Sequence, residues 1–369
     1  MTPVRVLHIF GAMDRGGAEL RTVELLRAVD PARVTLEFCT LLGSAGALDG
    51  EIRSLGGAVH ACPLGASFLP RFIALVRQRR IDVVHSHVHY TSGLILASAR
   101  VAGVRSRIAH FRSTRDERGG SVARRAYRSL MRRLVDRNAT QVIGVANGVL
   151  DSAWPGWRHD RRCIVIYNGV DPRPFVDPSA RRALRATLRL PDATPIVVHV
   201  ARFDPLKNQR QAVEVLATVP EAHLVYVGRE SPLAAECRHR AVALGVEARV
   251  HFVGERQDVP RFLCGADVSL LTSTAEGLPG VVLESLAAGT PVVASDLPGV
   301  REIAAVLPGA VRIHRLDEPA GRWAASVRDL LMSPRDASLP ARFASSPFAL
   351  AAAATAFLDV WEQQGRRPG

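Results

Sequence analysis

The chain has 369 residues, of which 47% are hydrophobic and 22% are charged, a globular composition without a signature of disorder. This length predicts two domains. No apolar run reaches the roughly 18 residues of a membrane-spanning helix, and the first residues lack the pattern of a secretory signal peptide. Five cysteines are scattered along the chain, which excludes a disulfide framework and a CxxC metal site and leads us to expect a cytoplasmic protein.

The net charge of +13 is concentrated in the first half of the chain. Residues 1–171 hold 25 Arg against 14 acidic residues, a balance of +11, whereas residues 172–369 hold 23 basic against 21 acidic residues, a balance of +2. This asymmetry indicates an anionic partner for the first half, either a nucleic acid or a membrane surface.

Predicted strands and helices alternate through the first half. A strand at 4–10 leads into a glycine loop, and a helix follows at 18–29. Further strands are predicted at 34–42, 58–64, 81–86, 105–111, 140–146 and 163–170, and further helices at 47–55, 68–80, 91–103 and 121–137. This alternation predicts an α/β domain with a parallel sheet covered by helices on both faces.

The pattern restarts after a Pro-rich connector at 171–178, the best candidate for a domain boundary. Strands are predicted at 195–201, 223–228, 250–254, 267–273 and 290–296, with helices at 179–189, 208–218, 232–244, 258–265 and 281–289. An irregular segment at 333–347 precedes a last apolar helix at 348–364. Two doubly wound halves of similar size are therefore expected in tandem.

The predicted helix at 121–137 is basic and amphipathic. Its apolar residues recur every fourth position (Val122, Ala126, Leu130, Leu134), and arginines cover the rest (Arg124, Arg125, Arg128, Arg132, Arg133). Such a helix lies on anionic lipid, or it presents a solvated arginine face beside a core stripe. Nucleic-acid binding is disfavoured, because no interleaving of aromatic and basic residues and no nucleic-acid motif accompanies it.

The first glycine loop contains Gly11, Gly16 and Gly17. It matches neither a dinucleotide-binding GxGxxG loop nor a Walker A loop, because no Lys follows the glycines and no ribose-binding acid is suitably placed. A glycine pair before a helix lets an anion approach the helix N-terminus, or it serves only as a tight turn.

Two cations follow the buried strand at 195–201. Arg202 and Lys207 lie five residues apart on the loop that leads into the next helix, and Lys207 is the only lysine among 48 basic residues. Open α/β sheets bind ligands at the carboxyl ends of their strands, so this pair predicts a phosphate site. The alternative is a solvated loop carrying two surface charges.

Residues 273–302 carry two glutamates, Glu276 and Glu284, around a Gly-Leu-Pro-Gly turn. The backbone N–H groups of the turn and of the helix N-terminus point to one place, where they can hold hydroxyls or phosphate. Each carboxylate can accept a pair of sugar hydroxyls. The alternative is that both are ordinary surface glutamates. The Ala-Ala-Gly-Thr-Pro segment that follows disfavours this alternative, because it ends the helix and leads directly into another buried strand.

These segments resemble the retaining GT-B glycosyltransferases of family 4. The resemblance rests on ARFDPLKN, on the stretch from AEGLPG to GVREI, on VIYNGVD, on GGAE at 16–19 and on VVHSH at 83–87. It implies two Rossmann-like domains that face a cleft: an acceptor-binding domain at 1–171 and a nucleotide-sugar-binding domain at 172–347. It also implies that a C-terminal helix (348–369) crosses back to the first domain.

The resemblance implies transfer of a hexose-type sugar, with retention, from a nucleotide-diphosphate sugar to a hydroxyl acceptor. UDP is favoured over GDP, and the acceptor is a lipid-linked glycan or a natural-product aglycone. The protein would act in the cytoplasm, with a possible peripheral site on the inner face of the plasma membrane. A catalytically silent sugar-nucleotide-binding protein and a nucleotide-dependent oxidoreductase are the alternatives. The four motif residues Arg202, Lys207, Glu276 and Glu284 argue against the first, and the missing dinucleotide fingerprint argues against the second.

Residue roles implied by the resemblance follow the same motifs. Arg202 and Lys207 would neutralise the leaving diphosphate, and Glu284 would bind the ribose. Glu276 and the turn would hold the donor sugar, Gly16 and Gly17 would approach the donor, and backbone near Arg256 would meet the base. His110 would face the reacting sugar. The residues of the turn are Gly277, Leu278, Pro279, Gly280 and Val281.

No Asp-x-Asp motif is present, so neither a metal nor another cofactor is expected. A phosphate oxygen of the donor would take the acceptor proton. His85, His87 and His89 alternate at a strand end. Histidines in this pattern more often line a cleft or pack against other side chains than bind zinc. Two departures from the family pattern are Gly280, where related sequences often carry Asn or Ser, and the segment Arg229, Glu230 and Ser231 after the strand at 223–228. They leave the contacts to the sugar and the choice of base open.

Overall fold

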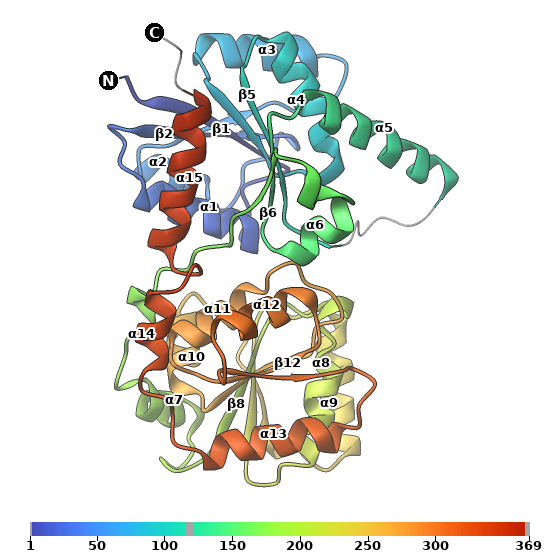
Figure 1. Cartoon of the computed structure of the whole chain (residues 1–369). Helices are drawn as coiled ribbons and strands as arrows, with labels where there is room; N and C mark the ends of the chain where they lie inside the picture. Colours follow the sequence, from blue (N-terminus) through green and yellow to red (C-terminus); the bar gives the residue numbers. More distant parts are fainter. Residues whose placement is uncertain (1, 115–120, 366–369) are drawn as a thin grey trace. The chain divides into compact units, whose positions relative to one another are not determined.

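The computed structural model describes residues 2–114 and 121–365. The described chain divides into two compact units: unit 1 takes its residues from 1–169 and 350–369, and unit 2 spans 170–349. Figure 1 shows the helices and strands of both. The last four residues of the predicted crossing helix (366–369) lie outside the described residues. Nowhere in the described chain is a helix both long and apolar enough to cross a bilayer.

Unit 1 is built on a seven-stranded parallel sheet with the order β3-β2-β1-β4-β5-β6-β7. The direction of winding reverses between β1 and β4, and ligands bind outside the carboxyl ends of strands at such a point. Its strands are β1 (Val4–Phe10), β2 (Val34–Thr40), β3 (Ala58–Ala61), β4 (Val83–Ser86), β5 (Ser106–Phe111), β6 (Gln141–Gly144) and β7 (Cys163–Val165).

Helices cover both faces of this sheet, as Figure 1 shows. They are α1 (Gly17–Ala28), α2 (Asp49–Ser54), α3 (Phe68–Gln78), α4 (Ser92–Val101), α5 (Val122–Asn138), α6 (Asn147–Ala153) and α15 (Leu350–Gly365). The last of these comes from the far end of the chain and joins the core of unit 1, where Phe357 and Trp361 are 2% and 0% exposed. The expectation that the C-terminal helix returns to the first half of the chain is therefore confirmed.

Unit 2 repeats the design with a six-stranded sheet of order β10-β9-β8-β11-β12-β13, reversing between β8 and β11. Its strands are β8 (Ile196–Val200), β9 (His223–Val227), β10 (Val250–Phe252), β11 (Val268–Leu271), β12 (Val292–Ser295) and β13 (Val311–His314). Its helices are α7 (Ala180–Leu188), α8 (Gln209–Ala217), α9 (Pro232–Ala243), α10 (Val259–Gly265), α11 (Gly280–Ala287), α12 (Pro298–Val306), α13 (Ala320–Met332) and α14 (Leu339–Ala344).

Both sheets are parallel and doubly wound, so the predicted fold class is confirmed. Two local predictions are wrong. Only residues 163–165 of the strand predicted at 163–170 join the sheet, while Val170 forms an isolated bridge with Ala349. The segment at 333–347 contains α14, because Leu339 and Phe343, four residues apart, are both buried.

A buried ion pair links α7 to the start of β11. Arg185 is 1% exposed and donates to Oδ2 of Asp267 over 2.5 Å and to the carbonyl oxygens of Arg181 and Gly265. The other carboxylate oxygen of Asp267 pairs with Arg181, whose side chain is 48% exposed. One acid thus meets two arginines of very different burial.

A second buried carboxylate belongs to Glu37 on β2. The carboxylate accepts hydrogen bonds from Arg79 at 2.9–3.1 Å and lies 2.6 Å from the imidazole of His60. Burial by itself disfavours the charged form, but the bonds to His60 and Arg79 outweigh it and lower the pKa of Glu37 to about 2.

Candidate active site

The site predicted in unit 2 lies at the carboxyl ends of β8 and β11, where the winding of the sheet reverses. After β8 the chain makes the short turn η4 (Pro205–Lys207) and enters α8. Asp204 stabilises this turn, because its carboxylate accepts the backbone N–H of Leu206 at 2.9 Å. Asn208 then adopts a left-handed conformation with φ of 48°, which ends the turn and begins the helix.

Lys207 meets Glu276 at this edge. The ammonium Nζ lies 2.6 Å from Oε1 of Glu276, and the hydroxyl of Ser273 donates to the same oxygen at 2.8 Å. The side chains of Lys207 and Glu276 are 23% and 17% exposed, so the pair is open to a ligand but partly shielded from water. Two residues that the sequence pattern assigns to phosphate and sugar therefore lie in direct contact.

Arg202 lies in a more exposed environment than Lys207. Its side chain is 55% exposed, and its guanidinium pairs with Asp204 at 3.2 Å. Gln209 donates to its backbone oxygen at 2.8 Å, which ties the start of the loop to the first turn of α8. The loop thus carries one shielded and one open cation.

The turn before α11 is held closely against the next helix. A Cβ built on Gly299 of α12 would lie 2.1 Å from the backbone oxygen of Gly277, so only glycine allows this approach. Pro279 is the N-cap of α11, and Glu284 lies on its second turn, half-buried. At Gly280 a built Cβ meets no atom within 4 Å, so the absence of Asn or Ser there leaves open space beside the helix N-terminus.

Arg256, predicted near the base, follows β10. Its side chain is 42% exposed and pairs with Asp258 at 2.8 Å. The loop after β9 begins with Gly228, where a built Cβ would lie 2.0 Å from the oxygen of Ala201. Glycine is thus required at this edge even though the residues after it are Arg229 and Glu230.

In unit 1 the glycine loop closes over the end of β1. Gly16 is the N-cap of α1, and a Cβ there would lie 2.2 Å from a carboxylate oxygen of Glu19. Gly46, from the loop after β2, packs so tightly that its Cβ would lie 2.4 Å from the oxygen of Met13. The sequence analysis missed Gly46, which no local pattern singles out.

Four histidines from three strands gather on one face of the sheet in unit 1. His8 lies opposite His85 in the pairing of β1 with β4, and their rings are 4.9 Å apart. His87 and His110 complete the group, with rings 5.0 Å from each other. His89 lies apart from them and contacts Tyr90 and Phe111.

Hydrogen bonds arrange these four rings into two chains. Trp361 of α15 donates to Nδ1 of His85 at 3.2 Å, and Nε2 of His85 lies 3.1 Å from Nδ1 of His110. Arg112 donates to Nδ1 of His87 at 3.1 Å, and Nε2 of His87 lies 2.9 Å from Nδ1 of His8.

The tautomers of the cluster follow from its donors. Burial lowers the pKa of all four rings, to about 3 for His8, with Arg112 adding to the effect, so the imidazoles are neutral. Indole and guanidinium N–H groups only donate, so each Nδ1 that they reach is an acceptor, and the hydrogen lies on Nε2. His110 and His8 in turn accept at Nδ1 from the Nε2–H groups of His85 and His87, so their own hydrogen also lies on Nε2.

This arrangement does not suit a metal ion. Nitrogen atoms of His8, His85 and His87 lie within 4.8 Å of one another, a grouping of metal-site size. Each ring, however, already uses its single lone pair to accept a hydrogen bond, and a metal needs that lone pair.

His110 is 1% exposed, packed between His85 and Phe357 of α15. Direct contact with a donor sugar stays a prediction for this residue, and its burial argues against it. Arg112 was missed, although it follows β5 directly. It donates to the oxygen of Ala18 and to Oγ1 of Thr22 on α1, and burial lowers its pKa to about 10.

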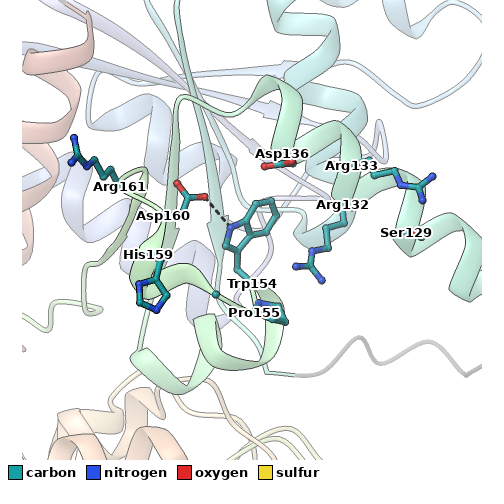
Figure 2. A pocket seen from close by; sticks show the side chains of 10 residues that line it. Ser129, Arg132, Arg133, Asp136, Trp154, Pro155, His159, Asp160 and Arg161 are labelled. Carbon is teal, nitrogen blue, oxygen red and sulfur yellow. Dashed lines mark hydrogen bonds between the residues drawn. The ribbon is translucent and has the colours of Figure 1, made fainter.

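A pocket of about 650 Å³ lies elsewhere in unit 1, between α5 and residues 154–161, and contains none of the predicted site residues. Figure 2 shows Trp154 near its centre, hydrogen-bonded to Asp160, with Arg132 beside it and with Arg133 and Arg161 at opposite ends of the view. The guanidinium of Arg132 lies 5.4 Å from the indole ring.

Comparisons with known proteins match both halves of the chain. The family model described as Glycosyltransferase Family 4 matches residues 15–174, and the model described as Glycosyl transferases group 1 matches residues 180–332. The chain is 30% identical over 336 residues to the putative glycosyltransferase EpsF of Bacillus subtilis, covering 88% of this chain and 86% of the relative. It is 26% identical over 308 residues to the capsular polysaccharide biosynthesis glycosyltransferase CapH of Staphylococcus aureus, covering 81% and 83%.

Solved structures share the fold over the whole chain. The HepE protein of Anabaena in complex with UDP superposes with a TM-score of 0.83 at 19% identity, covering 98% of this chain and 100% of that one. The sucrose-phosphate synthase of Thermosynechococcus elongatus superposes with a TM-score of 0.78 at 20% identity, covering 98% of both chains.

Proposed function

Because the chain belongs to the family 4 and group 1 glycosyltransferases, we propose that it moves a hexose-type sugar, with retention, from a UDP-sugar to a hydroxyl acceptor. The observation that carries this proposal is the contact of Lys207 with Glu276 beside the N-terminus of α11. The place where a cation, a sugar-binding carboxylate and a helix N-terminus meet suits an anionic leaving group joined to a sugar.

In the proposed reaction Lys207 and Arg202 stabilise the negative charge that develops on the departing diphosphate. Lys207 is held at the end of the short turn η4 and is partly shielded from water, and preorganised charge of this kind is the main catalytic need of the step. Glu276 holds the donor sugar together with the turn at 277–281, and Glu284 holds the ribose. The acceptor attacks from the face that the diphosphate leaves, and a phosphate oxygen takes its proton.

We propose UDP in preference to GDP because HepE, which shares the fold, is in complex with UDP, and a further crystal structure of HepE contains UDP-glucose. No metal or cofactor has a part in the proposed reaction, since two basic side chains are available for the diphosphate and no Asp-x-Asp pair is present to hold an ion.

Calorimetry with free UDP and free GDP tests the donor site. We expect UDP to bind more tightly, Glu284→Ala to weaken UDP binding, and Glu276→Ala to impair transfer while leaving the affinity for free UDP largely unchanged. Equal losses of UDP affinity in both variants would refute this division of roles. Binding of a UDP-sugar without turnover of any acceptor would instead support a silent binding protein.

We further propose that α5 brings unit 1 to an anionic membrane on the cytoplasmic side, where a lipid-linked glycan is the acceptor. The helix extends away from the body of unit 1 (Figure 1). The predicted apolar stripe is not its core face: Val122 and Leu130 are 73% and 53% exposed, whereas Met131 and Val135 are buried. Exposed apolar side chains among arginines are typical of a helix that lies in a lipid interface.

The two acids of the nearby pocket pair with an arginine that lies outside α5. Arg162 pairs with both of them, with Asp136 at 2.7 Å and with Asp160 at 2.8 Å. Each arginine near an anionic leaflet contributes about 1 kcal/mol, so the five arginines predicted to face the lipid supply several.

Liposome sedimentation tests the membrane proposal. Binding is expected to require anionic lipid and to fall at 1 M salt, where the Debye length shortens to about 3 Å. It is also expected to weaken when the five arginines become Gln (Arg124, Arg125, Arg128, Arg132, Arg133). A protein that ignores anionic liposomes at low salt would favour a soluble acceptor such as a natural-product aglycone.

A further inference from the structure

Thr272 binds the backbone of the loop that carries Lys207. It follows β11 directly and is 0% exposed. Its Oγ1 lies 2.9 Å from the carbonyl oxygen of Lys207 and 2.9 Å from that of Asn208. A hydroxyl has one hydrogen, so this hydrogen is shared between the two carbonyls and the oxygen lone pairs stay available.

His199 completes the arrangement from the neighbouring strand β8. Its Nε2 lies 3.1 Å from Oγ1 of Thr272, and the residue is 1% exposed. Because the hydroxyl hydrogen of Thr272 already serves the carbonyls, the hydroxyl accepts here, and Nε2 of His199 carries the donated hydrogen. Burial, with Lys207 as the second cause, lowers the pKa of His199 to about 4, so its ring is neutral at pH 7.

The backbone of this loop has a fixed turn at Asn208. This residue has a φ of 48°, a left-handed conformation that asparagine adopts more readily than most other residues with a side chain. The backbone N–H of Thr274 also reaches this loop and donates to the oxygen of Leu206 at 2.8 Å. The segment after β11 therefore holds three successive carbonyls, those of residues 206, 207 and 208.

We propose that Thr272 and His199 are positioning residues of the transfer reaction, which hold the backbone at Lys207 and Asn208 so that the ammonium of Lys207 points to the diphosphate site. The proposal rests on the proposed function and assigns roles to two residues that touch neither donor nor acceptor. Their effect is transmitted through backbone carbonyls, so it falls on the phosphate contact and not on recognition of the nucleoside.

The test replaces Thr272 with Val, which has the same shape and lacks the hydroxyl. We expect kcat to fall about 10- to 100-fold, the scale of a displaced catalytic group, with the acceptor KM changed less than about threefold. The affinity for UDP is expected to fall about tenfold, while that for uridine, which has no diphosphate, stays the same. Thr272→Ser keeps the hydroxyl and should restore both kcat and UDP affinity.

Thr290→Val is the matched control. Thr290 is also 0% exposed, and its hydroxyl donates to a carbonyl oxygen, that of Leu263, at 2.6 Å. It should lose stability by a similar amount and keep kcat and UDP affinity. If Thr272→Val does not fold, His199→Phe removes the donor behind the hydroxyl and should give a smaller change in the same direction.

The outcomes separate this proposal from the proposed function. A wild-type protein that transfers sugar, with a Thr272→Val variant no different from Thr290→Val, overturns the positioning role alone. The positioning role is also overturned if the affinities for UDP and for uridine fall equally in Thr272→Val. A wild-type protein that neither binds UDP or GDP nor turns over a donor overturns both.

Discussion

Replacing Lys207 with Met separates the stability of one ion pair from its proposed catalytic role. An exposed pair contributes at most about 1 kcal/mol, whereas breaking a buried pair costs about 3–5 kcal/mol. Lys207 and Glu276 are 2.6 Å apart with side chains 23% and 17% exposed, so they lie between these limits. Ser273 still donates to Glu276 after the change, which limits the loss. We expect the free energy of unfolding to fall by about 2 kcal/mol.

The effect on transfer is expected to be larger. Loss of one preorganised charge contact to the leaving group lowers kcat about 10²–10³-fold, which corresponds to about 2.7–4 kcal/mol of transition-state stabilisation. Urea unfolding measures the first quantity, and initial rates at saturating donor measure the second.

Arg240→Met is the control for this experiment. Arg240 pairs with Glu214 at 3.2 Å on the surface of the same unit, with both side chains about one-third exposed. This variant should keep kcat and change stability by less than about 1 kcal/mol. If Lys207→Met retains transfer within threefold of wild type, the assignment of Lys207 to the leaving diphosphate is refuted.

Further predictions concern other parts of the molecule. Arg185→Met should lower the free energy of unfolding by about 3–5 kcal/mol, because it leaves the carboxylate of Asp267 without its buried partner. Arg181→Met removes only the exposed partner of Asp267 and should lower it by less than about 1 kcal/mol. Urea titrations measure both values, and equal losses would contradict the reasoning. Trp361→Phe removes the donor to Nδ1 of His85. In ¹⁵N NMR spectra the main form of the His85 ring should be the Nε2–H tautomer in wild type and a mixture of tautomers in the variant. A dominant Nδ1–H form in wild type would disprove the two chains of hydrogen bonds. The folded-state pKa of Glu37 is about 2 and the ordinary value is 4.5, so its contribution of about 3 kcal/mol is complete above pH 4.5 and disappears as the pH falls towards 2; Glu37→Gln should flatten this part of the stability profile, and an unchanged profile would exclude the linkage. Transfer should continue in excess EDTA, and full loss that one divalent ion restores would overturn the metal-free mechanism.

Local patterns in the sequence predict much of the fold. Helix α3 shows the helical period, because Phe68, Phe72 and Val76 recur every four residues and are all buried. Strand β8 is a short buried run rich in Ile and Val, as expected for a central strand of a parallel sheet. Pro232 and Gly245 mark the two ends of α9. The pattern is less clear where an element is short or its apolar face is interrupted. For this reason α14, which has six residues, was predicted as irregular. The sequence analysis also left α6, α12, β13 and α13 unidentified.

The histidines show what alternation along a strand leaves undetermined. A period of two predicts that His85 and His87 share a face of β4, but not whether that face meets solvent, a ligand or a helix. The answer depends on Trp361, which is 276 residues away in sequence and reaches His85 only because α15 packs on the sheet of unit 1.

The candidate site was likewise predicted only in part from the sequence. Residue type and short spacing were enough to single out Arg202, Lys207, Glu276 and Glu284, since each motif lies within one loop and the helix that follows it. Only the tertiary structure brings Lys207 to Glu276 across 69 residues, because the order of β8 and β11 places their carboxyl ends side by side. The role of Thr272 likewise depends on the fold: no spacing rule relates a threonine after one strand to two carbonyls after another, and the contact exists because both strands are packed into one sheet.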